Sequence, residues 1–139
     1  MSYFSKVTAL LTMVFCGLLL SSGARAADAT VYIISPVHGE VVNSPVLVRF
    51  GLRGMGVAPA GVDLANTGHH HLLIDVEELP ALDQPVPADT KHIHFGKGQT
   101  EVEIELEPGE HTLQLMLGDK FHMPVGAALV SEKINITVK

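Results

Sequence analysis

Histidines are concentrated in two short segments of the sequence. Three are consecutive in GHHHLLID, at residues 69–71, and two alternate in HIHF, at His92 and His94. Neutral imidazole binds transition metals such as copper and zinc, so clustered histidines indicate a candidate metal site. The chain contains eight histidines, and the other three are His38, His111 and His122.

The spacing of the clustered histidines suits β-strands. Residues two apart in a strand project to the same face, so His69 and His71 point together while His70 points the other way. The same rule pairs His92 with His94. If the two segments are neighbours in one sheet, about 4.8 Å apart, four imidazoles can converge on one ion at the ~2.0–2.1 Å typical of metal–nitrogen bonds. We therefore predict that these two pairs are metal ligands.

A further pair of candidate ligands, His122 and Met123, occurs in GDKFHMP, a loop just past an expected strand. A thioether beside an imidazole favours copper, particularly Cu(I), over zinc. The alternative for Met123 is packing, as an anchor of the loop in the core.

The remaining polar candidates have weaker claims. His111 shares parity with the leucines of its strand, so we expect it at the edge of the core, either hydrogen-bonded or ligating. His38 is expected as an exposed turn residue and is left out of the site. Asp75 shares parity with His71 and could orient an imidazole, but four residues of strand separate them by ~13 Å.

The chemistry of the cluster has an alternative explanation. In that interpretation Ile93 and Phe95 face the core, His92 and His94 lie on a solvated face, and the triple histidine is the start of a strand. The histidines would then form a polar surface that changes charge with pH, because imidazole titrates near pH 6.5.

Short β-rich segments separated by Gly, Pro and Asn predict an all-β fold. The clearest alternation sets Val102, Ile104 and Leu106 against a row of glutamates, which is typical of a strand with one buried face. We expect a single Ig-like antiparallel β-sandwich of about seven strands. The expected strands span residues 30–35, 45–54, 69–76, 92–95, 100–107, 111–119 and 132–139.

The connections between these strands are also predicted. The turn EPGE should join the strands 100–107 and 111–119 as a hairpin, with Leu113, Leu115 and Leu117 buried. The first two strands resemble the first hairpin of Ig-like bacterial domains. Residues 54–68 and 77–89 are rich in Gly, Pro and Ala and are expected as long loops that flank the triple histidine.

Residues 1–26 have the pattern of a signal peptide. Lys6 precedes an apolar core that is too short for a membrane span of ~20 residues, and Ala24-Arg25-Ala26 forms a small-x-small cleavage site. Residues 27–139 then form one domain, without a membrane span, that is periplasmic or secreted. Cys16, the single cysteine, lies in the signal peptide, so the exported domain has no thiolate ligand and no disulfide.

The charge of the exported domain excludes several kinds of partner. Without Lys6 and Arg25, seven of the nine basic residues remain against fifteen acidic ones, a net charge of about −8 with neutral histidines. Nucleic acids and anionic membrane surfaces recruit basic patches, so neither is expected as a partner. The expected partners are a metal ion and another envelope protein, and the oligomeric state is left open.

Several segments together resemble a known family. They are GHHHLLID, HIHFGKGQTE, PGEHTLQLMLGD and HMP before VSEKINITV. They resemble a family of small exported bacterial proteins described as a domain of unknown function (DUF4399-like), over about Ser35 to Val138. The resemblance implies an exported Ig-like domain and supplies no activity. In this family the stretch after HMP often holds another histidine, where this chain has VGAALV, and this weakens the argument that the loop binds metal.

The leading hypothesis is a periplasmic protein that binds copper, or alternatively zinc, for sequestration or delivery. The order of metal affinities places Cu(II) above Zn(II) for nitrogen ligands. The second hypothesis is a metal-free interaction module of the cell envelope. A copper redox enzyme of the superoxide dismutase type is less favoured, because the sequence has no bridging-histidine pattern and no stabilising disulfide, and no serine or cysteine nucleophile motif supports hydrolysis.

The signal peptide makes export testable. Mass spectrometry of the chain from an envelope fraction should find an N-terminus at or near Ala27, because cleavage follows Ala26 in the predicted motif. Recovery of the intact chain, starting at Met1, from the cytoplasm would contradict export.

Overall fold

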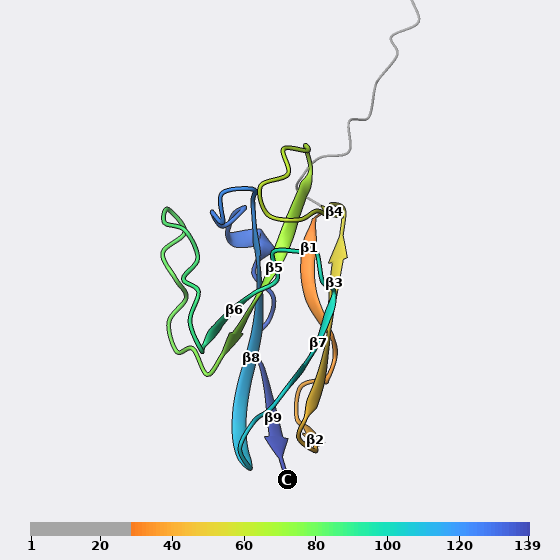
Figure 1. Ribbon diagram of the computed structural model, residues 1–139. Coiled ribbons are helices and arrows are strands. Elements are labelled where there is room, and N and C mark those ends of the chain that lie inside the picture. The colour runs from red at the N-terminus through yellow and green to blue at the C-terminus, as the bar shows by residue number, and fades with distance from the viewer. Residues whose placement is uncertain (1–28) are drawn as a thin grey trace, which may run out of the picture.

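Two β-sheets face each other in residues 29–139, the part of the chain described by this computed structural model (Figure 1). The predicted signal peptide lies outside the described residues. The strands are β1 (Thr30–Ser35), β2 (Glu40–Val42), β3 (Val46–Arg53), β4 (Gly56–Val57), β5 (Thr67–Ile74), β6 (His92–His94), β7 (Glu101–Ile104), β8 (Gly109–Gly118) and β9 (Ile134–Val138), and a short 3₁₀ helix, η2 (Ala127–Leu129), precedes β9.

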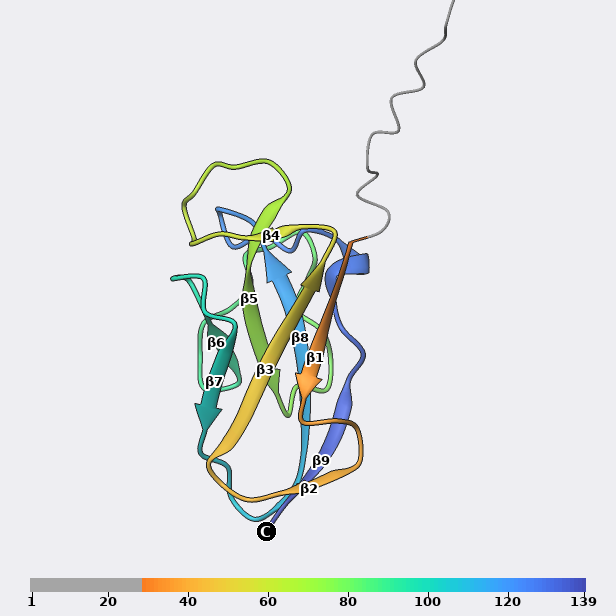
Figure 2. The same cartoon turned by 90° about the vertical axis from the view of Figure 1, so that its right-hand side faces the viewer.

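The smaller sheet has the order β1-β3-β7, and the larger one has the order β2-β9-β8-β5-β4, with β6 also paired to β5. Figure 2 shows the smaller sheet in front of the larger one. The strands pair antiparallel except for β2 with β9 and β4 with β5, which are parallel. The predicted all-β fold with antiparallel sheets is therefore confirmed. Among the described residues, no helix is long and apolar enough to cross a membrane.

One apolar core fills the space between the sheets. Strand β3 alternates, so that Val46, Val48 and Phe50 point inward. They meet inward-facing side chains of the larger sheet, which are Leu72, Ile74, Leu113, Leu115, Ile134, Ile136 and Val138. This alternation is the pattern that a strand with one buried face requires.

Each of the seven predicted segments contains a strand, and two further strands were not predicted. Strands β2 and β4 have three and two residues, too few for any alternation to be visible in the sequence. The two segments predicted as long loops form irregular structure apart from β4. The segment between β5 and β6 projects to one side of the larger sheet (Figure 1).

The predicted hairpin between residues 100–107 and 111–119 is wrong. Strand β7 pairs with β3 in the smaller sheet, whereas β8 pairs with β5 and β9 in the larger one. The chain crosses between the sheets after β7, where Ser44 Oγ accepts a hydrogen bond from the Leu106 N–H at 3.1 Å. Alternation shows only that each strand has an apolar face, and two strands facing one core from opposite sheets satisfy it equally well.

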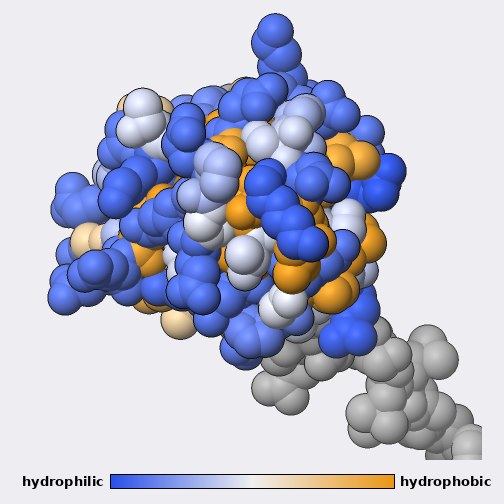
Figure 3. All heavy atoms as spheres, turned by 90° about the horizontal axis from the view of Figure 1, so that it is seen from below, coloured by the Kyte–Doolittle hydropathy of each residue, from blue (hydrophilic) through white to orange (hydrophobic). Residues whose placement is uncertain are grey.

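The predicted burial agrees with this arrangement. Ile104, Leu113 and Leu115 are buried in this core, and the partly buried Val102 and Leu106 pack against it. Leu117 is buried in a smaller cluster with Ala29 and Leu129. At the end where β9 terminates, the surface is mainly hydrophilic with smaller apolar areas between (Figure 3). Exposed apolar residues scattered in this way are ordinary in globular domains.

Strands β5 and β8 are buried on both faces, unlike their neighbours. From Gly68 to Ile74 and from Leu113 to Gly118 every residue is buried. On the outer face of the larger sheet, Leu73 and Met116 form a second small core with Val86, which comes from the segment between β5 and β6. That segment therefore covers the outer face of β5, next to its histidines.

Leu115 offers a test of the core. It is fully buried between the sheets, so Leu115→Ala should lower the free energy of unfolding by ~2–5 kcal/mol, the usual range for a core leucine. Chemical denaturation measures the loss. Val37→Ala is the control, because Val37 is 60% exposed and should change stability by less than about 0.5 kcal/mol. A loss at Leu115 no larger than at Val37 would contradict this core.

Candidate metal centre

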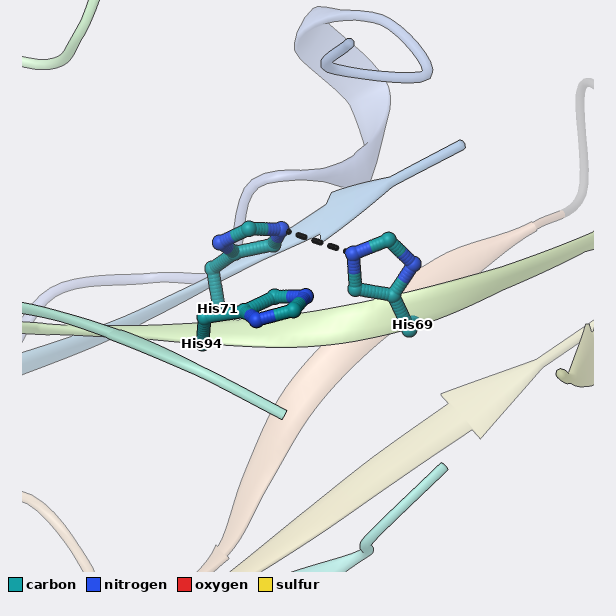
Figure 4. Close-up of side chains that lie close together, drawn as sticks. All are labelled: His69, His71 and His94. Atoms are coloured by element: carbon teal, nitrogen blue, oxygen red, sulfur yellow. Dashed lines mark hydrogen bonds between the residues drawn. The ribbon is translucent and has the colours of Figure 1, made fainter. Parts of the chain in front are cut away.

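Three imidazoles gather on the outer face of the larger sheet. His69 and His71 come from β5, and His94 comes from β6, where it is the direct cross-strand partner of His71. One ring nitrogen of each lies within 4.8 Å of those of the other two. Figure 4 shows the three rings on the same side of β5. The shared parity of His69 and His71 and the antiparallel pairing of β6 thus produce the cluster.

The closest pair of nitrogens has the spacing of two ligands of one ion. His71 Nε2 and His69 Nε2 lie 3.1 Å apart (Figure 4). Two nitrogens bound to one metal at ~2.0–2.1 Å, with an angle between about 95° and 110°, are about 3.0–3.4 Å apart. The same distance also fits a hydrogen bond in which one imidazole donates to the other.

Burial leaves some ring nitrogens of this cluster without partners. His69 and His71 are 0% and 1% exposed. Within the described residues, His94 Nε2 and the Nδ1 atoms of His69 and His71 are buried and have no hydrogen-bond partner. A buried unsatisfied polar group costs ~1–3 kcal/mol, and a metal held by His94 Nε2 would satisfy that atom. The two unpartnered Nδ1 atoms differ from most metal sites, where the second ring nitrogen donates to an oxygen.

The electrostatic environment keeps these imidazoles neutral. Burial, followed by repulsion from His94 and His122, lowers the pKa of His69 to about 4. Burial, followed by repulsion from His69 and His94, lowers the pKa of His71 to about 3. The pKa of His94 is also lowered, by burial and by His122. Only a neutral imidazole has a free lone pair for a metal, so the three rings are in the ligating form at neutral pH.

Two glycines make room for the rings. A Cβ at Gly118, the partner of His69 on β8, would lie 2.8 Å from His71 Nε2. A Cβ at Gly96 would lie 2.6 Å from His94 Nε2. Both distances are too short for real contacts, so any larger residue would displace an imidazole. Sequence reasoning missed both glycines, although each occurs within a histidine-containing motif, HIHFG and GDKFH.

His122 lies beside the cluster, in the turn after β8. Its ring centroid is 4.7 Å from that of His94, 5.1 Å from that of His69 and 6.2 Å from that of His71. Met123 follows in the same turn, where its backbone N–H donates to Asp119 Oδ1 at 2.9 Å. Both side chains are half-buried. The structure thus brings the predicted loop histidine next to the histidines of the strands.

His92 does not join the cluster. It is on β6, where it pairs with Leu73 of β5. Two residues separate it from His94, a distance of about 6.6 Å along the strand. Its Nδ1 is hydrogen-bonded to Asp89 Oδ1 at 2.8 Å. The structure therefore brings together three of the four histidines predicted as strand ligands, and the ring of His122 lies beside them.

The other histidines lie elsewhere. His70 points inward, as parity predicts, and its ring centroid is 5.2 Å from that of Phe50. Burial lowers its pKa to about 4. His111 is hydrogen-bonded by Nδ1 to Asp75 Oδ2 at 2.7 Å and by Nε2 to the Glu107 carbonyl at 2.8 Å. Asp75 therefore orients His111 and not the cluster. His38 is exposed, as predicted, and its Nδ1 accepts a hydrogen bond from the Asn135 N–H.

The depressed pKa values predict the pH dependence of the metal-free protein. His69, His70 and His71 titrate between about 3 and 4 when folded, against 6.5 as the ordinary value. The unfolded chain therefore binds more protons below pH 6.5, and the free energy of unfolding should fall steadily from pH 6.5 to 4. Denaturant titrations with a chelator present measure this fall.

One histidine acts in the opposite direction. Burial opposes protonation of His111, but the hydrogen bonds to Asp75 and Glu107 outweigh it and raise the pKa. Its contribution to the free energy of unfolding is present at low pH and is lost as the pH rises through the raised pKa of His111. Four histidines have lowered pKa values and one has a raised value, so the loss of stability in acid dominates. A stability that stays constant from pH 7 to 4.5 would contradict the burial of the three imidazoles.

The comparisons with known proteins give one match. A family model described as a domain of unknown function (DUF4399) matches residues 48–139. The matched range contains His69, His71, His94 and the turn with His122. No curated protein and no solved structure matches the chain.

Proposed function

We propose a metal-binding function for this chain, which belongs to the family of domains of unknown function called DUF4399. The observation that carries the proposal is the convergence of three neutral imidazoles from β5 and β6, with one nitrogen of each within 4.8 Å of the others. His69, His71 and His94 would hold one ion, and His122 and Met123 in the neighbouring turn are candidates for further ligands.

Copper is the metal that we propose, with zinc as the alternative. The cluster offers nitrogen donors, and the single cysteine, Cys16, lies in the predicted signal peptide, so the exported domain has no thiolate. Imidazole suits both Cu and Zn, and Cu(II) forms the more stable complexes with a given set of nitrogen ligands. Hard cations such as Mg²⁺ and Ca²⁺ prefer oxygen ligands, which the three imidazoles lack.

Sequestration or delivery fits this site better than catalysis. A catalytic metal needs an open coordination position that substrate can reach. Here His69 and His71 have almost no exposed surface, and the ring of His122 lies against those of His69 and His94. An ion in this position is shielded by protein, as storage or transfer requires. The signal-peptide pattern of residues 1–26 supports a location in the periplasm or outside the cell.

Single substitutions test the proposed ligands. His71→Ala and His94→Ala should each weaken Cu(II) affinity at least tenfold, or ~1.4 kcal/mol, because each removes one of three converging nitrogens. His92→Ala should leave the affinity nearly unchanged, since His92 is hydrogen-bonded to Asp89 and lies outside the cluster. Competition titrations against a chelator of known affinity measure these effects for Cu(II) and for Zn(II).

The His92 variant is the matched control, because it removes a histidine from the same short strand. Equal losses from all three variants would indicate diffuse binding to a histidine-rich surface. Failure of the unmodified chain to bind either ion saturably at micromolar concentration would overturn the proposal and favour a metal-free interaction module.

A further inference from the structure

The turn that carries His122 is built around one carboxylate. Asp119 Oδ1 accepts hydrogen bonds from the backbone N–H groups of Phe121 at 2.8 Å and Met123 at 2.9 Å, the two residues that flank His122. The His122 N–H donates to the Asp119 carbonyl, and the Asp119 N–H donates to the Met123 carbonyl. Asp119 thus fixes the backbone on both sides of His122.

This turn holds His122 in an unfavourable backbone conformation. Its φ is 66°, in the left-handed region that costs a non-glycine residue about 1–2 kcal/mol. The hydrogen bonds to Asp119 offset that cost. In this conformation the imidazole lies with its centroid 4.7 Å from that of His94 and 5.1 Å from that of His69. The strained backbone therefore directs the ring toward the three-histidine cluster.

We propose that His122 is an exchangeable fourth ligand of the metal and that Asp119 is the positioning residue that holds it in place. The inference rests on the proposed function and specifies how its site opens and closes. Four imidazoles would give the ion four protein ligands, the number at which a structural site is closed to other ligands. Metal enters and leaves when the turn moves His122 aside, while the other three imidazoles stay fixed.

The difference in backbone support makes His122 the ligand that moves. The backbones of His69, His71 and His94 are fixed by the ladder that joins β8, β5 and β6, and the side chains of His69 and His71 are fully buried. His122 belongs to a short turn whose neighbouring Phe121 is 66% exposed. Its carbonyl accepts one hydrogen bond from the Val86 N–H at 2.9 Å, which ties the turn to the segment that covers β5. Releasing the turn breaks its hydrogen bonds to Asp119 and Val86 but leaves the pairing of β5 with β6 and β8 intact.

Cu(II) binding to the full chain and to its variants tests both residues. His122→Ala should still bind one Cu(II) through the other three imidazoles. Its release rate to a chelator, measured by stopped flow, should rise at least tenfold, and the nitrogen couplings in its electron paramagnetic resonance spectrum should change because one imidazole is lost. An unchanged spectrum and release rate would show that His122 only packs against the site.

Asp119 is tested by rescue. Asp119→Ala should raise the release rate in the same direction as His122→Ala, because the turn loses both acceptor bonds. Asp119→Asn should restore the slow release and the parent spectrum, since an amide oxygen accepts the same two N–H bonds. If Asp119→Asn behaves like Asp119→Ala, the carboxylate acts through its charge or as a ligand, and the positioning role is overturned.

Two further measurements separate this inference from the function on which it rests. Phe121→Ala, an exposed change in the same turn, should release Cu(II) at the parent rate, and fast release would attribute the effects to general loosening of the turn. If His71→Ala loses affinity while His122→Ala matches the parent, the metal site stands and the fourth ligand fails. If the parent chain binds no Cu(II), both fail together.

Discussion

Strand β5 is covered on both faces, and this burial determines the chemistry of its histidines. On the inner side it packs against the core between the sheets, and on the outer side Val86 and Met116 pack against Leu73. Imidazoles placed on such a strand lose contact with water, so the neutral form is favoured and their pKa values fall. The same burial leaves ring nitrogens without partners. An ion held by the cluster would satisfy one of them, His94 Nε2.

Strand periodicity carried much of the site prediction. The parity of His69 and His71 and the inward direction of His70 follow from a period of two. The pairing of HIHF with this strand was a condition of the prediction, and the structure meets it. Periodicity did not show how far β6 would extend along β5, so it assigned the same role to His92 as to His94. Periodicity also did not predict the role of Gly96 and Gly118, because the space around an imidazole depends on which other segments pack against it.

Contacts between segments distant in sequence account for what the sequence did not predict. Alternation in residues 101–107 and 111–117 described two strands correctly but not their separate sheets. The covering segment looked like an ordinary loop, because the packing of Val86 on Met116 and the hydrogen bond from Val86 to His122 are visible only in the folded chain. His122 was found because it stands beside Met123 in a loop just past an expected strand, whereas the two hydrogen bonds that Asp119 accepts in this turn are visible only in the folded chain.

The run from His69 to Ile74 has three polar residues followed by three apolar ones, so hydrophobic alternation does little to define its register. A slip of one residue against β8 would turn His70 outward alone and place His69 and His71 in the core. Asp75 opposes such a slip, because its Oδ1 accepts from the Thr112 N–H at 2.8 Å and its N–H donates to the Thr112 carbonyl. A register shifted by one residue would not present two imidazoles of β5 on the outer face, so a bound ion would also favour the native register over it during folding.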